Sequence, residues 1–297
     1  MRPAPICAAV LALALAACQP VRPDAPPAPA ATAQAATAAT AADDNLNAVL
    51  WVQRSAEYRA AALQTYRAAT LQLDAALAQP DWDALVPAER EGSGPALKPA
   101  VVLDIDETVL DNSPYQARLV RDGGEYSDPS WDAWVEERKA RAVPGVVEFA
   151  RAANARGITL VYISNRAVHL ADATVDNLRA EGLPVEGDDV FLGLGTVVPG
   201  CEQHGSEKDC RRRLASRTYR VLMQFGDQLG DFLKIEDNSP AGRQAQLERH
   251  GDWFGSRWWM LPNPTYGSWE PALFDNRWKQ PRQTRRAAKR AALEVAP

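Results

Sequence analysis

Short apolar runs along this chain alternate with helical patterns. Five runs have the length and composition of buried strands: 100–105, 158–164, 190–192, 219–225 and 258–261. Four stretches space their apolar residues as helices do: about 145–156, 168–181, 206–217 and 240–249. This alternation predicts an α/β fold with a parallel sheet and helices on both of its faces.

The N-terminal part of the chain predicts a helical cover preceded by a tether. Residues 45–79 carry the apolar spacing of long amphipathic helices, and Asp43 or Asp44 can cap their start. Residues 18–44 are rich in Ala, Pro and Thr and cannot bury a core, so we expect a disordered tether there. The folded domain is therefore expected over 45–276.

The first residues have the pattern of an export signal. Residues 1–17 start with the basic Arg2 and continue as an apolar stretch too short to span a bilayer. The small residues before Cys18 resemble the lipobox of bacterial lipoproteins, in which this cysteine becomes the lipidated first residue. Gln19 follows where the inner-membrane retention signal has Asp, which favours the outer membrane. The alternative is a plain cleaved signal with an incidental cysteine.

The distribution of charged residues bears on whether the protein binds nucleic acid. The formal net charge is −5, yet the chain ends in a basic tail, predicted over 277–297. Its seven basic residues are Arg277, Lys279, Arg282, Arg285, Arg286, Lys289 and Arg290. Such a tail is typical of a solvated helix or loop end. Export makes nucleic acid a still poorer partner, so no nucleic-acid site is expected.

Two cysteines remain once the signal and the lipid site are set aside. Cys201 and Cys210 lie a short loop apart, and an exported protein favours a disulfide between them. A free pair is the alternative. A metal site would need further ligands, and the only histidine nearby is His204.

Carboxylates follow two of the predicted strands. Asp104 and Asp106 stand at the end of the first strand, and Asp227 and Asp231 follow the run VLMQF. The carboxyl ends of strands in an open α/β sheet form its usual ligand site. Two acids there can act as nucleophile and proton donor, and together they can hold a hard cation. The alternative for each pair is an acidic surface turn.

Two further positions offer groups that bind anions. The strand LVYIS ends in Ser164 and Asn165 just before a helix, where a hydroxyl, an amide and free backbone N–H groups can meet an anion. Lys208 stands near the start of a basic helix and can neutralise a phosphate. The alternatives are a simple helix cap at Ser164 and a surface charge at Lys208.

In this order the four signals resemble the motifs of the haloacid dehalogenase superfamily. Within it the chain resembles the bacterial class C acid phosphatases, the lipoprotein 5′-nucleotidase family. The resemblance rests on DIDETVLDNSPY, WDAWVEERKARAVPGVVEF, YISNR and GDQLGDF, together with the lipoprotein signal, and it covers most of 45–275. It implies a Rossmann-like parallel sheet with a small, mainly helical cap. Members of this family often pair, and the sequence leaves a homodimer open.

The resemblance also implies roles for single residues. Asp104 would be the nucleophile that forms an aspartyl-phosphate, and Asp106 the acid that protonates the leaving alcohol and later activates water. Three residues would bind the phosphate: Ser164, Asn165 and Lys208. Mg²⁺ would be held by Asp104, the backbone carbonyl of Asp106 and Asp227, with Asp231 steadying its waters. Because Asp106 must carry a proton when substrate arrives, we expect an acidic to near-neutral pH optimum.

One departure from the family pattern concerns the lysine. Lys208 stands in EKDCRRR, whereas the family has a context like DKxxRR. Cys201 and Cys210 bracket this loop, so the predicted disulfide would influence how Lys208 approaches the phosphate.

Aromatic residues bear on the choice of substrate. Five of them fall in segments that resemble the family's cap and C-terminal loop: Tyr115, Trp131, Trp134, Tyr266 and Trp269. We expect Tyr266 and Trp131 to stack on a nucleobase and the others to pack elsewhere. The resulting hypothesis is a lipid-anchored phosphatase of nucleoside 5′-monophosphates. The alternatives are a broad phosphatase without base preference and a non-catalytic envelope lipoprotein.

Overall fold

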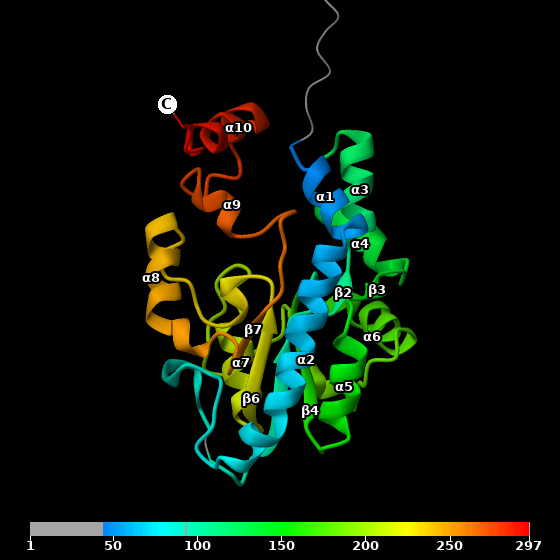
Figure 1. The fold of residues 1–297 in the computed structure, drawn as a ribbon, viewed down its shortest axis with the longest axis vertical. Coiled ribbons are helices and arrows are strands. Elements are labelled where there is room, and N and C mark those ends of the chain that lie inside the picture. Colours follow the sequence, from blue (N-terminus) through cyan, green and yellow to red (C-terminus); the bar gives the residue numbers. More distant parts are fainter. Residues whose placement is uncertain (1–43, 93, 297) are drawn as a thin grey trace, which may run out of the picture. The chain divides into compact units, whose positions relative to one another are not determined.

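The computed structural model describes residues 44–92 and 94–296. The predicted signal, Cys18 and nearly all of the tether lie outside this part. The main sheet has five parallel strands in the order β5-β4-β1-β6-β7; Figure 1 labels β4, β6 and β7 of this sheet. The strands are β1 (Lys98–Leu103), β4 (Thr159–Ala167), β5 (Phe191–Leu194), β6 (Tyr219–Gly226) and β7 (Trp258–Met260). Each predicted strand is present, and the α/β prediction is confirmed.

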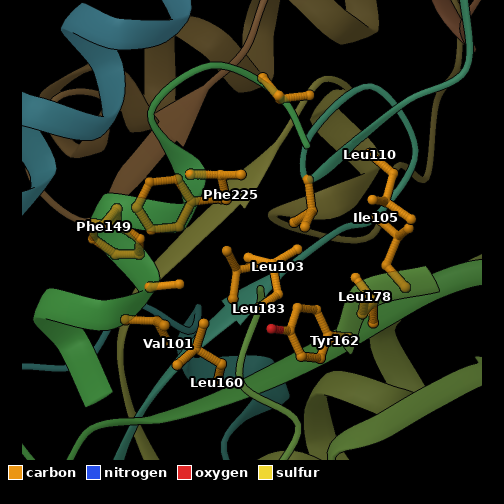
Figure 2. Close-up of a cluster of buried hydrophobic side chains, with 14 of the residues drawn as sticks. Val101, Leu103, Ile105, Leu110, Phe149, Leu160, Tyr162, Leu178, Leu183 and Phe225 are labelled. Atoms are coloured by element: carbon orange, nitrogen blue, oxygen red, sulfur yellow. The ribbon is translucent and has the colours of Figure 1, made fainter. Parts of the chain in front are cut away.

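Both faces of the central strand are buried. Val101 and Leu103 belong to one hydrophobic cluster, whereas Ala100 and Val102 belong to a second cluster. This split follows from the two-residue period of a strand, and it explains why β1 reads as a continuous apolar run. Figure 2 shows the first cluster, where Leu103 lies near Phe225. Fully burying a side chain of this size contributes roughly 1.5–3 kcal/mol.

Helices cover the two faces. The first cluster contains residues of α2, α5 and α6, and the second contains a residue of α7. These helices are α2 (Ala56–Ala78), α5 (Val146–Asn154), α6 (Ala171–Ala180) and α7 (Asp209–Ser216). The predicted helix at 240–249 is α8 (Pro240–His250), and a short helix α9 (Trp269–Ala272) follows it. The predicted helices are therefore confirmed, with ends that differ by a few residues.

The N-terminal cover is broken at Ser55. Helix α1 (Leu46–Arg54) ends there, and the Ser55 hydroxyl accepts from the Tyr58 amide at 3.0 Å to cap α2. Of the two expected caps, Asp43 lies outside the described residues and Asp44 is wrong. The residue at the cap position of α1 is Asn45, without a side-chain cap bond, while Asp44 forms an ion pair with Arg286 at 2.6 Å.

A small cap is inserted after β1. It consists of the antiparallel pair β2 (Leu110–Asp111) and β3 (Arg141–Ala142) with α3 (Ser113–Asp122) and α4 (Asp128–Glu136) between them. This matches the expected small, mainly helical cap.

Part of the basic end of the chain contacts the rest of the domain. It forms α10 (Arg282–Ala291), in which Arg285 is only 9% exposed and pairs with Glu125 at 2.5 Å. Lys289 pairs with Glu270 at 2.8 Å. The expectation of a solvated helix holds for most of the tail, where Arg277, Lys279, Arg282 and Arg290 are exposed, and it is wrong for Arg285. Within the described ranges, no helix is both long and apolar enough to cross a membrane.

The strand order fixes where a site can form. From β1 the chain adds β4 and then β5 on one side, and β6 and then β7 on the other. The order therefore reverses at β1, and crevices at such a switch point are the usual ligand sites of open α/β sheets. The carboxyl end of β1 carries Asp104 and Asp106.

Candidate active site

Asp104 and Asp106 lie just beyond the central strand. β1 ends at Leu103, and the Asp104 amide donates to the Phe225 carbonyl of β6 at 2.9 Å. Ile105, between the two acids, is fully buried. The segment is therefore held firmly against the sheet, and its two carboxylates are directed toward different neighbours.

Asp104 belongs to a group of three carboxylates, of which Asp104 and Asp231 are buried and Asp227 is partly exposed. Oxygens of Asp104, Asp227 and Asp231 all lie within 4.8 Å of one another. Lys208 Nζ donates to Asp104 and, at 2.7 Å, to Asp231. Burial opposes the charge of Lys208, but the two carboxylates outweigh burial and raise its pKa. The fold thus joins four residues that the sequence placed at two strand ends and a helix start.

One lysine does not neutralise this group. Burial raises the pKa of Asp104 well above its ordinary value; Lys208 opposes this shift, and the neighbouring carboxylates add to it. Burial also raises the pKa of Asp227, to about 7. The excess of negative charge and the oxygen donors fit a small divalent cation, which would favour the ionised carboxylates.

The end of β6 is built to hold two of these acids. Asp227 accepts from Asn263 Nδ2 at 2.8 Å and from Gln228 Nε2 at 2.9 Å. A glycine is required at 226, because a Cβ there would lie 2.3 Å from the Cβ of Asp231. The sequence pattern did not indicate Asn263, since it stands in an irregular loop 36 residues from its partner.

The predicted phosphate-binding pair, Ser164 and Asn165, lies within the last four residues of β4, which continues to Ala167. Ser164 is fully buried, and Asn165 is exposed and lines the cleft described below. Arg211 holds both residues, because its guanidinium donates to the Ser164 carbonyl and, at 2.7 Å, to Asn165 Oδ1. It also donates to the Glu207 carbonyl at 2.9 Å. The sequence did not single out Arg211, since nothing in a run of three arginines tells which one is buried here.

Asp106 has a different partner, Arg166, to which the sequence patterns gave no role. Arg166 Nε donates to Asp106 Oδ1 at 2.9 Å, and the Arg166 side chain is fully buried. Asn112 Nδ2 donates to the same oxygen at 2.9 Å. The Asp106 carboxylate is thus engaged outside the three-carboxylate group, so a metal contact would come from its backbone carbonyl, as the resemblance implies.

The site opens into a cleft of about 1140 Å³. Asp104, Asp106 and Lys208 line it. The aromatic residues divide into two sets. Of the five that the sequence singled out, Trp131, Tyr266 and Trp269 line the cleft, whereas Tyr115 and Trp134 are each 2% exposed and pack in the core; Tyr126 and Trp278, which the sequence did not indicate, also line it.

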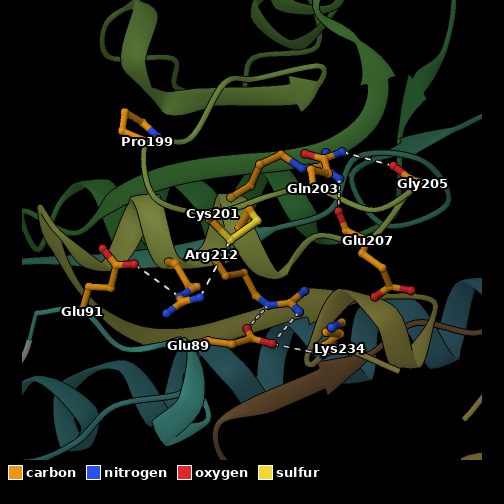
Figure 3. The surroundings of a disulfide bond; sticks show 12 residues. Glu89, Glu91, Pro199, Cys201, Gln203, Gly205, Glu207, Arg212 and Lys234 are labelled. Carbon is orange, nitrogen blue, oxygen red and sulfur yellow. Dashed lines mark hydrogen bonds and ion pairs between the residues drawn. A yellow bond between two sulfur atoms is a disulfide. The ribbon is translucent and has the colours of Figure 1, made fainter. Parts of the chain in front are cut away.

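A disulfide joins Cys201 to Cys210 at the start of α7. It closes the loop that contains Lys208, the residue at the N-cap position of α7. Figure 3 shows the buried ion pair between Arg212 and Glu89 close to this bond. The disulfide and the ion pair together anchor the first turn of α7, and so the lysine of the site.

Solved structures support the fold over almost all of their length. "The structure of the Class C acid phosphatase from Bacillus anthracis" is 34% identical, has a TM-score of 0.72 and is covered over 98% of its chain and 85% of this one. A second structure of that phosphatase, "with tungstate bound", is 35% identical with a TM-score of 0.74 and the same coverage.

Curated relatives are more distant plant proteins. The Stem 31 kDa glycoprotein of Glycine max is 26% identical over 166 residues, and Acid phosphatase 1 of Solanum lycopersicum is 23% identical over 170 residues. The matched part spans 56% of this chain and 58% and 57% of these two relatives.

A family match covers most of the chain. Residues 13–269 match the family described as HAD superfamily, subfamily IIIB (Acid phosphatase). Together with the solved structures, this match confirms the resemblance drawn from the four motifs and the predicted enzyme class. The chain belongs to HAD subfamily IIIB, the acid phosphatases, and thus to a family of phosphoric monoester hydrolases.

Proposed function

We propose that this protein is a Mg²⁺-dependent phosphomonoesterase that hydrolyses nucleoside 5′-monophosphates through an aspartyl-phosphate on Asp104. One observation carries the proposal: Lys208 and the carboxylates of Asp227 and Asp231 converge on Asp104 inside a cleft. A carboxylate attacks a phosphate dianion only when positive charge offsets the repulsion.

The residues that would hold the ion are Asp104, Asp227 and the Asp106 carbonyl, with Asp231 orienting its water. When bound, Mg²⁺ would offset the negative charges of the phosphate and of Asp104. The described side chains supply the oxygen donors that this cation prefers, with a net negative charge that one lysine leaves uncompensated.

The chain's own residues then divide the reaction. An Asp104 oxygen attacks phosphorus, and the bond to the leaving oxygen breaks as Asp106 gives that oxygen its proton. Asp106, now ionised, takes a proton from a water that attacks the aspartyl-phosphate, so phosphate leaves and Asp104 is restored. Ser164, Asn165 and Lys208 would hold the oxygens of the transferred group.

The leaving group would rest against the aromatic wall of the cleft. Trp131 and Tyr266 line the cleft together with Asp104, so a base can stack there while its phosphate reaches the acids. A Tyr266→Ala variant is expected to lose the preference for 5′-AMP over an aryl phosphate; an unchanged ratio would remove this residue from the substrate site.

The second candidate is a broad phosphatase without base preference. The size of the cleft favours it, because about 1140 Å³ exceeds the common range of roughly 300–1000 Å³ for small-molecule sites. Turnover of 5′-AMP, an aryl phosphate and a sugar phosphate separates the two candidates, since equal efficiency on all three would favour the broad enzyme.

The experiment that tests the main proposal measures phosphate release from 5′-AMP. It uses the form lacking residues 1–18, with Mg²⁺ and with excess chelator, beside an Asp104→Asn variant. Release that needs both the metal and Asp104 supports the proposal. No release from 5′-AMP or from a panel of simple esters would favour a binding lipoprotein instead.

We also propose that Cys18 carries a lipid that anchors the protein to the outer membrane. The export pattern before Cys18 supports this proposal. Incorporation of labelled palmitate in cells, absent in a Cys18→Ser variant, is the expected result. Equal labelling of both forms would exclude this cysteine as the site.

A further inference from the structure

Asp106 is held by an arginine and an asparagine that no motif assigns to it. We propose that Arg166, with Asn112, is a positioning residue for proton transfer: it fixes one carboxylate oxygen of Asp106 and leaves the other to serve the leaving group. This inference rests on the proposed function, in which Asp106 is the acid.

The two oxygens of Asp106 are bonded unequally. Oδ1 receives Arg166 Nε and Asn112 Nδ2, each at 2.9 Å, and Arg166 Nη2 also lies 2.9 Å from it. Among the described residues, Oδ2 has one weaker contact, from the Ser164 hydroxyl at 3.4 Å. Oδ1 is therefore the fixed oxygen, and Oδ2 remains to exchange a proton.

Arg166 and Asn112 are themselves buried and hydrogen-bonded. Arg166 is fully buried in its side chain, and it also donates to Asn112 Oδ1 at 3.2 Å and to the Thr174 hydroxyl at 3.4 Å. Asn112 is fully buried as well. A planar guanidinium fixed on three sides restricts the carboxylate to one orientation, which a flexible ammonium would not do.

The clamp of Arg166 and Asn112 is connected to the cap. The ring of Trp131 lies over the Arg166 guanidinium at 5.7 Å, within the range of a cation–π contact. Trp134 Nε1 donates to Asn112 Oδ1 at 2.8 Å. Both tryptophans belong to α4, so the orientation of Asp106 depends on the helix whose Trp131 also lines the cleft.

Arg166 acts on a different part of the chemistry from Lys208. Its bonds to charged side chains, among the described residues, go to Asp106 and not to Asp104, Asp227 or Asp231. Loss of Arg166 should therefore leave the attack of Asp104 in place and impair protonation of the leaving oxygen. Alkoxide leaving groups need that proton, whereas nitrophenolate leaves readily without it.

The test compares kcat/KM for 5′-AMP and for p-nitrophenyl phosphate, because kcat/KM covers the steps through loss of the first leaving group. For Arg166→Met we expect a loss of about 10²-fold on 5′-AMP, the usual contribution of general acid catalysis, and a loss of less than about 5-fold on the aryl ester. Arg166→Lys, which keeps the charge and most of the volume, should show the same split and guards against a misfolded variant.

Two control variants complete the test. Asp106→Asn should reproduce the split between substrates. Arg220→Lys should change kcat/KM for neither substrate, because Arg220 is a buried arginine whose hydrogen bonds, within the described part of the chain, go to backbone carbonyls such as that of Gln79.

Equal losses on both substrates, or none, in the Arg166 variants would overturn the positioning role. If Asp106→Asn also lacks the split, the acid role of Asp106 fails and the inference fails with it. If Asp106→Asn shows the split and the Arg166 variants do not, only the inference fails. Lack of wild-type activity on both esters would overturn the proposed function and, with it, this inference.

Discussion

Asp104 and Asp106 leave the same strand two residues apart, yet their carboxylates lie in opposite surroundings. Asp104 is buried beside the carboxylates of Asp227 and Asp231, and Lys208 donates to it. Asp106 bonds to a buried arginine and asparagine. The comparison teaches that a pair of identical residues acquires two different sets of partners from the elements that pack on each side of it, which is what the two proposed roles require.

The largest effect should come from exchanging the two acids for amides. Asp104→Asn should lower turnover of every substrate by on the order of 10⁴-fold or more, because no nucleophile remains. In the Asp106→Asn variant, Asp104 should still attack an aryl phosphate. The phosphoryl group should then stay on Asp104, because no base activates the water that removes it. Intact-mass spectrometry after mixing with substrate detects this adduct. Asp74→Asn, at an exposed ion pair on α2, is the control; an adduct on Asp104→Asn would contradict the assignment.

Removing Lys208 tests the Asp104 side of the comparison between Asp104 and Asp106. Lys208→Met should lower kcat/KM by about 10²–10³-fold, to the same extent for 5′-AMP and p-nitrophenyl phosphate, because the lysine serves the phosphate side. Steady-state kinetics on both esters checks this. A loss of kcat/KM confined to 5′-AMP would mean that Lys208 acts on the leaving group. It would contradict the assignment of Lys208 to Asp104 and the phosphate.

The pH dependence of stability should reflect the buried acids beside Asp104. Asp227 has a pKa of about 7, against an ordinary value of 3.8, so the folded protein holds this proton more tightly than the unfolded chain does. Its contribution to stability is present below pH 4 and is lost as the pH rises toward 7. The metal-free melting temperature should therefore fall by several degrees between pH 5 and pH 7.5, at about 2–4 °C per kcal/mol.

Scanning calorimetry with and without Mg²⁺ checks this prediction. Mg²⁺ should raise the melting temperature more at pH 7.5 than at pH 5, since it competes with protons for the same oxygens. Asp227→Asn should flatten the dependence. A melting temperature that rises with pH in the metal-free protein would contradict the raised pKa.

The smallest effect on turnover is expected from the disulfide. The double change Cys201→Ser and Cys210→Ser should cost about 2–3 kcal/mol of stability, a drop in melting temperature of about 4–12 °C. Because the ion pair of Arg212 with Glu89 still anchors α7, turnover of 5′-AMP should change only a few-fold. Loss of activity comparable to that of Lys208→Met would mean that the disulfide alone places the lysine.

The sequence by itself determined the order of strands and helices, the parallel sheet and the exit of β1 as the site. These depend on local periodicity and on the rule that ligands bind at the carboxyl ends of the strands in an open α/β sheet; that the strand order reverses at β1 came from the structure. It also singled out Asp104, Asp227, Asp231 and Lys208, because each follows a recognisable strand or opens a helix; their roles in the reaction stay predictions.

Only the tertiary structure decided the partners of these residues. Arg166 and Asn112 are 60 and 6 residues from Asp106, and Arg286 is 242 residues from Asp44. Local patterns carry no signal for such pairs, because a buried and a solvated arginine look alike in a sequence. Which charges meet depends on how strands and helices pack, and that packing gave one acid of β1 a lysine and the other an arginine.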